Sequence, residues 1–168
     1  MSIVLKPELD PYKVSKITLI GAVAVFNALK SIGIDSQIKW PNDIVINGKK
    51  ICGILTEMSA QFDYINHIVI GIGINVHNET FPEEISHIAS SLMLESNGGH
   101  FHRADIIEKT LEYFEVYYEQ YLETEDLSKL VPEYNSLLVN MQKEVKVLDP
   151  KDPFEGKAMG ITKSGELI

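Results

Sequence analysis

A tight turn between two β-branched runs constrains this sequence more than any other feature. Asn47-Gly48 separates the apolar residues 44–46 from the apolar residues 51–55. Asn-Gly is the strongest short signal for a two-residue hairpin, because both positions accept a positive φ. The stretch 39–55 is therefore predicted to form two antiparallel strands. If Asn47 and Gly48 are the loop, residues 46, 45, 44 and 43 are expected to pair with residues 49, 50, 51 and 52.

This register assigns side chains to the two faces of the hairpin, because successive residues of a strand point to opposite sides. One face, expected to be core, holds Ile44, Ile46, Ile51 and Gly53. The other face holds Asp43, Val45, Lys50, Cys52 and Ile54. Asp43 and Lys50 are then diagonal neighbours with Cα atoms roughly 7–8 Å apart, so a carboxylate and an ammonium are expected to converge on one ligand. The alternative is that Lys50 is a solvated residue beside a turn.

Four motifs then occur in a fixed order: KWPND at 39–43, GKKICGIL at 48–55, GIGIN at 71–75 and ASSL at 89–92. Together they resemble the bacterial biotin protein ligases, and the match covers most of the chain. The resemblance implies an α/β (α+β) fold in which helices cover a mixed β-sheet. It also implies two units, a partial biotin/lipoate ligase-like catalytic domain over 1–140 and an incomplete SH3-like barrel over 141–168.

The family's reaction has two steps, and the resemblance carries both to this sequence as expectations. Biotin attacks the α-phosphate of ATP, with Mg²⁺, to give biotinyl-5′-AMP and pyrophosphate; a lysine of a biotin carboxyl carrier protein then attacks that anhydride. The resemblance makes Lys50 and Asp43 the catalytic residues. It assigns biotin binding to Lys50, Gly53 and Ile54, and nucleotide binding to Lys39, Asn42 and Asn75.

The sequence also departs from the family. The Gly/Arg-rich loop that closes over biotin and phosphate, the segment that recognises the biotin ring and the winged-helix region are not found in it, and Arg103 is the only arginine. We therefore expect a chain truncated at both ends. Three hypotheses remain open: a fragment of a biotin ligase with little activity alone, a lipoate-type ligase, and a folded remnant without turnover. The full WPND motif and the C-terminal strands favour biotin.

Charge and cysteine content limit the partners. A formal net charge of −9 argues against nucleic acid, which normally needs a basic face. The single cysteine, Cys52, lies in an apolar strand, so no intramolecular disulfide is possible and a cytoplasmic location is expected. No apolar run reaches the roughly 18–20 residues of a membrane span, so no membrane partner is expected. A homodimer is a further expectation from the resemblance.

Periodicity outlines the remaining elements. Residues 12–32 are predicted to be a largely buried helix that ends at Gly33. Amphipathic helices are predicted at 103–122 and 127–138, the first with an apolar stripe of Ile107, Leu111, Phe114, Tyr118 and Tyr121. Strands are predicted at 1–5, 37–40, 64–75, 144–148, 154–162 and 166–168. Gly71 and Gly73 remove side chains from one strand face, which is typical of close approach by a backbone or ligand. The spacing of His77, His87, His100 and His102 matches no compact metal-ligand set.

Overall fold

A computed structural model describes residues 1–61, 64–148 and 151–168. Its main sheet has the order β1-β5-β4-β3-β2, and all neighbouring strands are antiparallel. The strands are β1 (Ser2–Leu5), β2 (Gln37–Lys39), β3 (Asp43–Ile46), β4 (Lys49–Ala60) and β5 (Ile65–Ile74). The fold is therefore α+β, and the expectation of a mixed sheet is wrong. Short connections join β2 to β5 in succession, which requires antiparallel pairing, and the one helical connection runs between the two outer strands.

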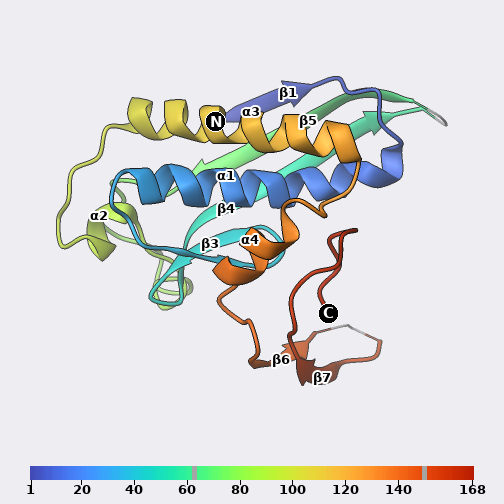
Figure 1. The fold of residues 1–168 in the computed structure, drawn as a ribbon. Coiled ribbons are helices and arrows are strands. Elements are labelled where there is room, and N and C mark those ends of the chain that lie inside the picture. Colours follow the sequence, from blue (N-terminus) through green and yellow to red (C-terminus); the bar gives the residue numbers. More distant parts are fainter. Residues whose placement is uncertain (62–63, 149–150) are drawn as a thin grey trace.

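Two long helices lie side by side on one face of this sheet (Figure 1). The chain enters through η1 (Pro11–Lys16) and continues as α1 (Ile17–Ser31), most of which is buried, as its apolar composition predicts. Gly33 follows the helix with a φ of 82°, a conformation that favours glycine. By length and composition, Pro11–Ser31 could cross a membrane, but 67% of its most apolar window is buried inside the protein, as in a core helix.

The second long helix, α3 (Arg103–Thr124), packs against α1 through a row that differs from the predicted stripe. Phe114 and Tyr121 are buried as predicted, but Ile107 and Leu111 are each 42% exposed. The buried row begins instead at Ile106. The contact between the helices includes a polar group, because the Asn27 amide of α1 donates to the Tyr117 hydroxyl at 3.0 Å. The buried row of α3 is therefore rotated relative to the apolar stripe that the sequence suggests.

The remaining elements are short. They are α2 (Leu92–Glu95), α4 (Val131–Leu137), β6 (Glu144–Val147) and β7 (Phe154–Lys157). Ser91 caps α2, and Pro132 lies in the first turn of α4. The strands β6 and β7 form a two-stranded sheet, whereas Ile161 and Leu167 share only an isolated bridge. The SH3-like barrel thus stays a prediction for the described part of residues 141–168.

Candidate functional site

The hairpin that carries the predicted site contains a β-bulge. The two residue pairs nearest the Asn47-Gly48 turn form as predicted, but the register then shifts by one residue. Asp43 consequently pairs with Gly53, where the sequence analysis expected Cys52. Ile51 is the extra residue of β4, and an extra residue in one strand changes which side chains share a face beyond it. The predicted pairing is therefore confirmed beside the turn and wrong beyond it.

The bulge exchanges the faces of Gly53 and Ile54. A Cβ built on Gly53 would lie 2.9 Å from both Lys50 Cε and Nζ, so residue 53 shares a face with Lys50. Ile54 instead is buried, and a Cβ added to Gly21 of α1 would lie 3.5 Å from its side chain. The assignment of Gly53 to the core face and of Cys52 and Ile54 to the Lys50 face is wrong, because Cys52 pairs with Ile44 and both are buried in the core. We call the sheet face that carries Lys50, away from α1, the open face.

Asp43 and Lys50 meet on the open face. Lys50 Nζ lies 2.6 Å from Asp43 Oδ1, and their side chains are 47% and 19% exposed, respectively. Asp43 Oδ1 is itself buried and accepts no hydrogen bond of regular geometry from the described residues, so the Lys50 ammonium compensates its charge. The predicted convergence of the two groups is confirmed. An ion pair of this exposure contributes little to stability.

Three glycines lie on the open face next to this ion pair, and the Lys50 side chain covers the first of them, Gly53. Gly53 pairs directly with Gly73, and Gly71 pairs with Leu55 two residues further along the strands. A Cβ on Gly71 or Gly73 would meet only a backbone carbonyl oxygen, at 3.7 and 3.8 Å. The surface above these residues is therefore free of other protein atoms at that range. We call Gly53, Gly71 and Gly73 the glycine floor.

Apolar side chains border the glycine floor on the side away from Lys50. Leu55 of β4 is 62% exposed, and Val4 of β1 is 67% exposed. Val4 pairs with Val69 two residues before Gly71, so alternation places it on the same face as the floor. An exposed apolar border beside a charged pair suits a ligand with an apolar body and an anionic end.

Lys39 and Asn42 come from the segment that leads into β3. Lys39 is exposed and pairs with Asp43 across β2 and β3, so it lies on the open face. Asn42 fixes the turn, because its backbone oxygen accepts from Ile54 N and its amide donates to Ile54 O, each at 2.9 Å. The Trp40–Pro41 peptide bond within this turn is cis. These two hydrogen bonds hold Asn42, the residue that precedes Asp43, against β4.

Asn75 lies where β5 ends, next to the bulge. Its N–H donates to the Ile51 carbonyl at 2.8 Å, and its side-chain amide donates to the Ser90 carbonyl at 3.0 Å. Asn75 therefore ties β5 to β4 and to the loop before α2. The predicted site residues Lys39, Asn42 and Asn75 all belong to the end of the sheet that holds the ion pair.

Cys52 is buried close to the Asp43–Lys50 ion pair. Burial first, and the neighbouring Asp43 carboxylate second, raise the pKa of the Cys52 thiol from 9.0 to about 12, against a lowering effect of Lys50. A thiol with this pKa stays protonated at neutral pH, so it is a packing group and a poor nucleophile.

Sequence spacing missed one cluster near the end of β5. The ring centroids of His77 and His100 lie 4.7 Å apart, and those of His100 and His102 lie 6.2 Å apart. His77 Nε2 accepts a hydrogen bond from Phe101 N at 3.3 Å, which ties two loops together. Across residues 1–61, 64–148 and 151–168, no three His, Cys, Asp or Glu side chains are placed to hold a metal ion.

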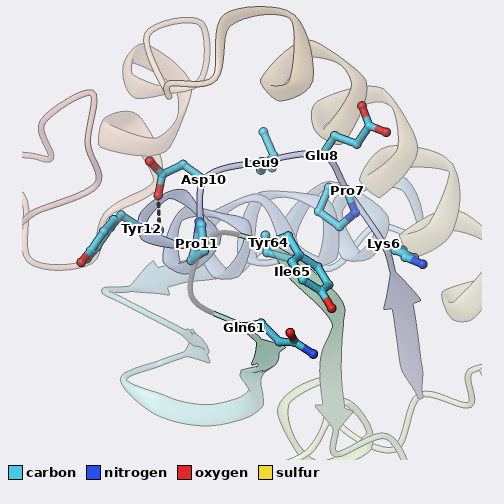
Figure 2. A pocket seen from close by; sticks show the side chains of 10 residues that line it. All are labelled: Lys6, Pro7, Glu8, Leu9, Asp10, Pro11, Tyr12, Gln61, Tyr64 and Ile65. Atoms are coloured by element: carbon cyan, nitrogen blue, oxygen red, sulfur yellow. Dashed lines mark hydrogen bonds between the residues drawn. The ribbon is translucent and has the colours of Figure 1, made fainter.

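Two sizeable cavities lie away from the ion pair. One of about 960 Å³ is formed by residues 6–12 and by the ends of β4 and β5 that lie far from Lys50 (Figure 2). A second, of about 410 Å³, separates the start of α1 from the C-terminal turn and is lined by Trp40, Pro41, Asn42 and Leu55, among others. The second cavity adjoins the segment that carries Asp43, which makes it the one relevant to the candidate site.

Comparison with known proteins agrees with this architecture. Residues 1–75 match the model of the biotin/lipoate A/B protein ligase family. The chain is 39% identical over 171 residues to the bifunctional ligase/repressor BirA of Bacillus spizizenii, and the same identity is found for BirA of Bacillus subtilis. These alignments cover 100% of this chain and 52% of each relative. The chain therefore spans about half the length of these curated relatives.

The fold is also similar to that of solved structures. The biotin protein ligase from Aquifex aeolicus in complex with biotin and ATP superimposes with a TM-score of 0.84 at 28% sequence identity. The superposition covers 99% of this chain and 68% of that protein. The five-stranded sheet, its helical cover and the C-terminal segment thus have counterparts in a protein known with both ligands bound.

Proposed function

Since this chain belongs to the biotin/lipoate A/B protein ligase family, we propose that it functions in the ATP-dependent ligation of biotin to a lysine of a biotin carboxyl carrier protein. The reaction passes through biotinyl-5′-AMP. The observation that carries this proposal is the Asp43–Lys50 ion pair at the border of the glycine floor. It offers a positioned ammonium next to a flat surface that a fused ring could cover.

Lys50 has the chemistry that the first step needs. When the biotin carboxylate attacks the α-phosphate of ATP, negative charge builds up on the phosphate oxygens. The Lys50 ammonium stabilises that charge, and such stabilisation accelerates the step when it is stronger in the transition state than in the ground state. The pyrophosphate then leaves, and the C–O–P anhydride of biotinyl-5′-AMP remains. Asp43 holds Lys50 in place through the 2.6 Å contact.

Asp43 has a second task in the transfer step. The carrier lysine must lose a proton as its amine attacks the anhydride carbonyl, and AMP leaves with the electron pair. A carboxylate within reach of that amine can accept the proton. Asp43 is assigned this role because it is a carboxylate of the candidate site and its side chain is 19% exposed.

The biotin and nucleotide contacts follow the same geometry. We assign the biotin ring to the surface over Gly71 and Gly73. Gly53 and Lys50 are assigned to its carboxylate end, because the Lys50 side chain lies over Gly53. Ile54 contributes by packing beneath the floor, because its side chain lies against α1. Lys39, Asn42 and Asn75 are assigned to the nucleotide side, where Lys39 supplies a charge. Asn42 and Asn75 hold the backbone around the site through the hydrogen bonds to Ile54 and Ser90.

Mg²⁺ fits this site as a companion of ATP. Within the described ranges no group of three metal-binding side chains is present, so the protein does not offer a complete cage. Mg²⁺ commonly binds through one or two carboxylates together with substrate phosphates. Asp43 is a carboxylate of this site that could provide such a contact. The ion would neutralise phosphate charge when bound.

The setting of this activity is part of the proposal. The proposed location is the cytoplasm, where ATP is available. A single buried, reduced Cys52 is compatible with that compartment. The division into a catalytic unit over 1–140 and a C-terminal unit over 141–168 is likewise proposed, as is a homodimer. Neither DNA nor a membrane is needed for the two chemical steps.

The experiment that tests the proposal measures adenylate formation by the purified chain. The protein is incubated with biotin and α-labelled ATP, and labelled biotinyl-5′-AMP is separated from ATP. Parallel reactions contain lipoate in place of biotin, and binding of preformed biotinyl-5′-AMP is measured by calorimetry. Biotin-dependent adenylate is the expected result. If an adenylate forms only with lipoate, the chain is a lipoate-type ligase. If no adenylate forms and biotinyl-5′-AMP does not bind, the chain is a folded remnant without turnover.

A further inference from the structure

A contact between distant parts of the chain links the C-terminal turn to the candidate site. The Trp40 indole Nε1–H donates to the Gly165 carbonyl at 3.0 Å, across 125 positions of sequence. Trp40 opens the segment 40–43 that ends with Asp43. We propose that the turn 162–166 is a positioning element that holds this segment, and thereby the Asp43 carboxylate, in its place beside Lys50.

The turn is built to be rigid. The Gly165 N–H donates to the Thr162 carbonyl at 3.0 Å, and the Thr162 N–H donates to the Glu166 carbonyl at 2.9 Å. Gly165 has a φ of +92°, which favours glycine. A Cβ at this position would lie 3.3 Å from Leu127 and 3.5 Å from Leu19, so the turn also fits closely against the protein body. A rigid turn can fix the group that donates to it.

The turn is also anchored to the protein body. The Leu127 N–H, in the segment between α3 and α4, donates to the Lys163 carbonyl at 2.9 Å. The Leu127 side chain is buried in the core. The acceptor for the Trp40 indole is therefore connected to the same core that supports the main sheet.

Helix α4 provides a second connection between the same two regions. The buried Tyr134 hydroxyl donates to the Pro41 carbonyl at 3.4 Å, and the Asn135 side chain accepts a hydrogen bond from Ile161 N at 2.9 Å. Adjacent residues of one helix thus hold both the segment before Asp43 and the chain just before the C-terminal turn. The two contacts fix the relative position of these segments.

Asn42 connects the 40–43 segment to the strand beside the ion pair. Asn42 makes two hydrogen bonds to Ile54, on the β4 edge next to Gly53. Asp43 follows directly and meets Lys50 at 2.6 Å. Neither Trp40 nor Gly165 forms a hydrogen bond or ion pair with Lys50 in the described contacts, so both act as positioning residues. If the Trp40 contact is lost, the segment is free to shift and the Asp43–Lys50 geometry loosens.

The inference rests on the proposed function for its catalytic consequence, but the mechanical part is testable without turnover. Trp40 is the only tryptophan, so its indole N–H gives one identifiable NMR signal. The experiment compares hydrogen exchange in the full chain with exchange in Trp40→Phe and in Gly165→Ala. Gly156→Ala is the matched control, because a Cβ at that C-terminal glycine meets nothing within 4 Å.

We expect that loss of the Trp40–Gly165 hydrogen bond, and of the local order that it provides, accelerates hydrogen exchange by about tenfold. The amides of 42–54 should exchange faster in Trp40→Phe, those of α1 should not, and Gly156→Ala should match the unaltered chain. In Gly165→Ala the indole signal itself should exchange faster. Unchanged exchange at 42–54 in a folded Trp40→Phe would overturn the inference. If Gly165→Ala does not fold, Trp40→Phe decides the matter alone.

Kinetics provides the second measurement. With biotin and ATP saturating, Trp40→Phe should lower the rate of adenylate formation by about tenfold while KM for biotin changes little, because a misplaced Asp43 affects the transition state more than ground-state binding. An equal rate in Trp40→Phe and the unaltered chain would overturn the inference. Inactivity of the unaltered chain would instead reject the proposed function, and the exchange data would still decide whether the turn positions the segment.

Discussion

Lys50 Nζ lies 2.6 Å from Asp43 Oδ1, and it occupies the space that a side chain on residue 53 would need. An ion pair whose lysine is 47% exposed is worth at most about 1 kcal/mol to folding. The absence of a side chain at Gly53 therefore makes room for a contact that the fold itself hardly requires. This combination indicates a functional role and leads to the predictions below.

Replacement of Lys50 by alanine should separate function from stability. Lys50→Ala is expected to lower biotinyl-5′-AMP formation by about 10²-fold or more, the scale seen when a charge-stabilising donor is lost. Its thermal midpoint should stay close to that of the unaltered chain. Lys49→Ala, one residue closer to the turn, is the control and should keep its rate. Equal rates for both variants would remove Lys50 from the mechanism.

Replacement of Gly53 by alanine should displace the lysine without unfolding the protein. The added Cβ would lie 2.9 Å from Lys50 Cε and Nζ, at the far end of a flexible side chain that can swing away. We expect a loss of adenylate formation of about tenfold or more and a change in stability below about 1 kcal/mol. Chemical denaturation and the adenylation assay measure the two quantities, with Gly156→Ala as control. A large loss of stability would mean that the Lys50 side chain cannot move away from the added Cβ.

The polar contact between the helices should contribute to folding. The Tyr117 hydroxyl lies 2.9 Å from both Glu133 carboxylate oxygens, to which it donates, and accepts from Asn27. Tyr117→Phe removes the donor and is expected to cost about 1–3 kcal/mol in the free energy of unfolding. Urea denaturation measures this cost. Tyr12→Phe serves as the control, since Tyr12 is 91% exposed; similar values for the two variants would contradict the packing described for α3.

The buried thiol should make stability depend on alkaline pH. Burial raises the pKa of Cys52 from 9.0 to about 12, so the folded protein holds this proton more tightly than the unfolded chain. The stabilisation is complete below pH 9 and is lost as the pH rises toward 12. The free energy of unfolding should therefore fall more steeply over this window in the unaltered chain than in Cys52→Ala. If the free energy of unfolding has the same pH dependence in both proteins, the Cys52 thiol is not shielded from solvent.

Much of the fold follows from local sequence signals. The Asn47-Gly48 turn, the apolar run of α1 and the strand that contains Gly71 and Gly73 each have a strong period or turn signal, and each forms where it is predicted. The proximity of Asp43 and Lys50 also follows, because the turn fixes which residues lie near each other. These features depend on residues close together in the chain.

Other features depend on packing that the sequence does not encode locally. A single extra residue at Ile51 has no compositional signature, and the faces of Gly53 and Ile54 reverse because of it. The buried side of α3 is likewise set by its neighbours. The contact between Trp40 and Gly165 joins residues too far apart in sequence for any spacing to suggest it. Register shifts, helix rotation and long-range contacts are therefore what the structure adds.

The most direct test of the open face as the ligand site is an NMR titration with biotinyl-5′-AMP. Amide signals of the ¹⁵N-labelled chain are followed at increasing ligand concentration. Saturable shifts that are largest at Gly53, Gly71 and Gly73 are the predicted result, since the ligand would lie over these residues. Absence of saturable shifts, or shifts confined to residues 6–12 around the cavity of about 960 Å³ (Figure 2), would contradict the assignment of the ligand to the glycine floor.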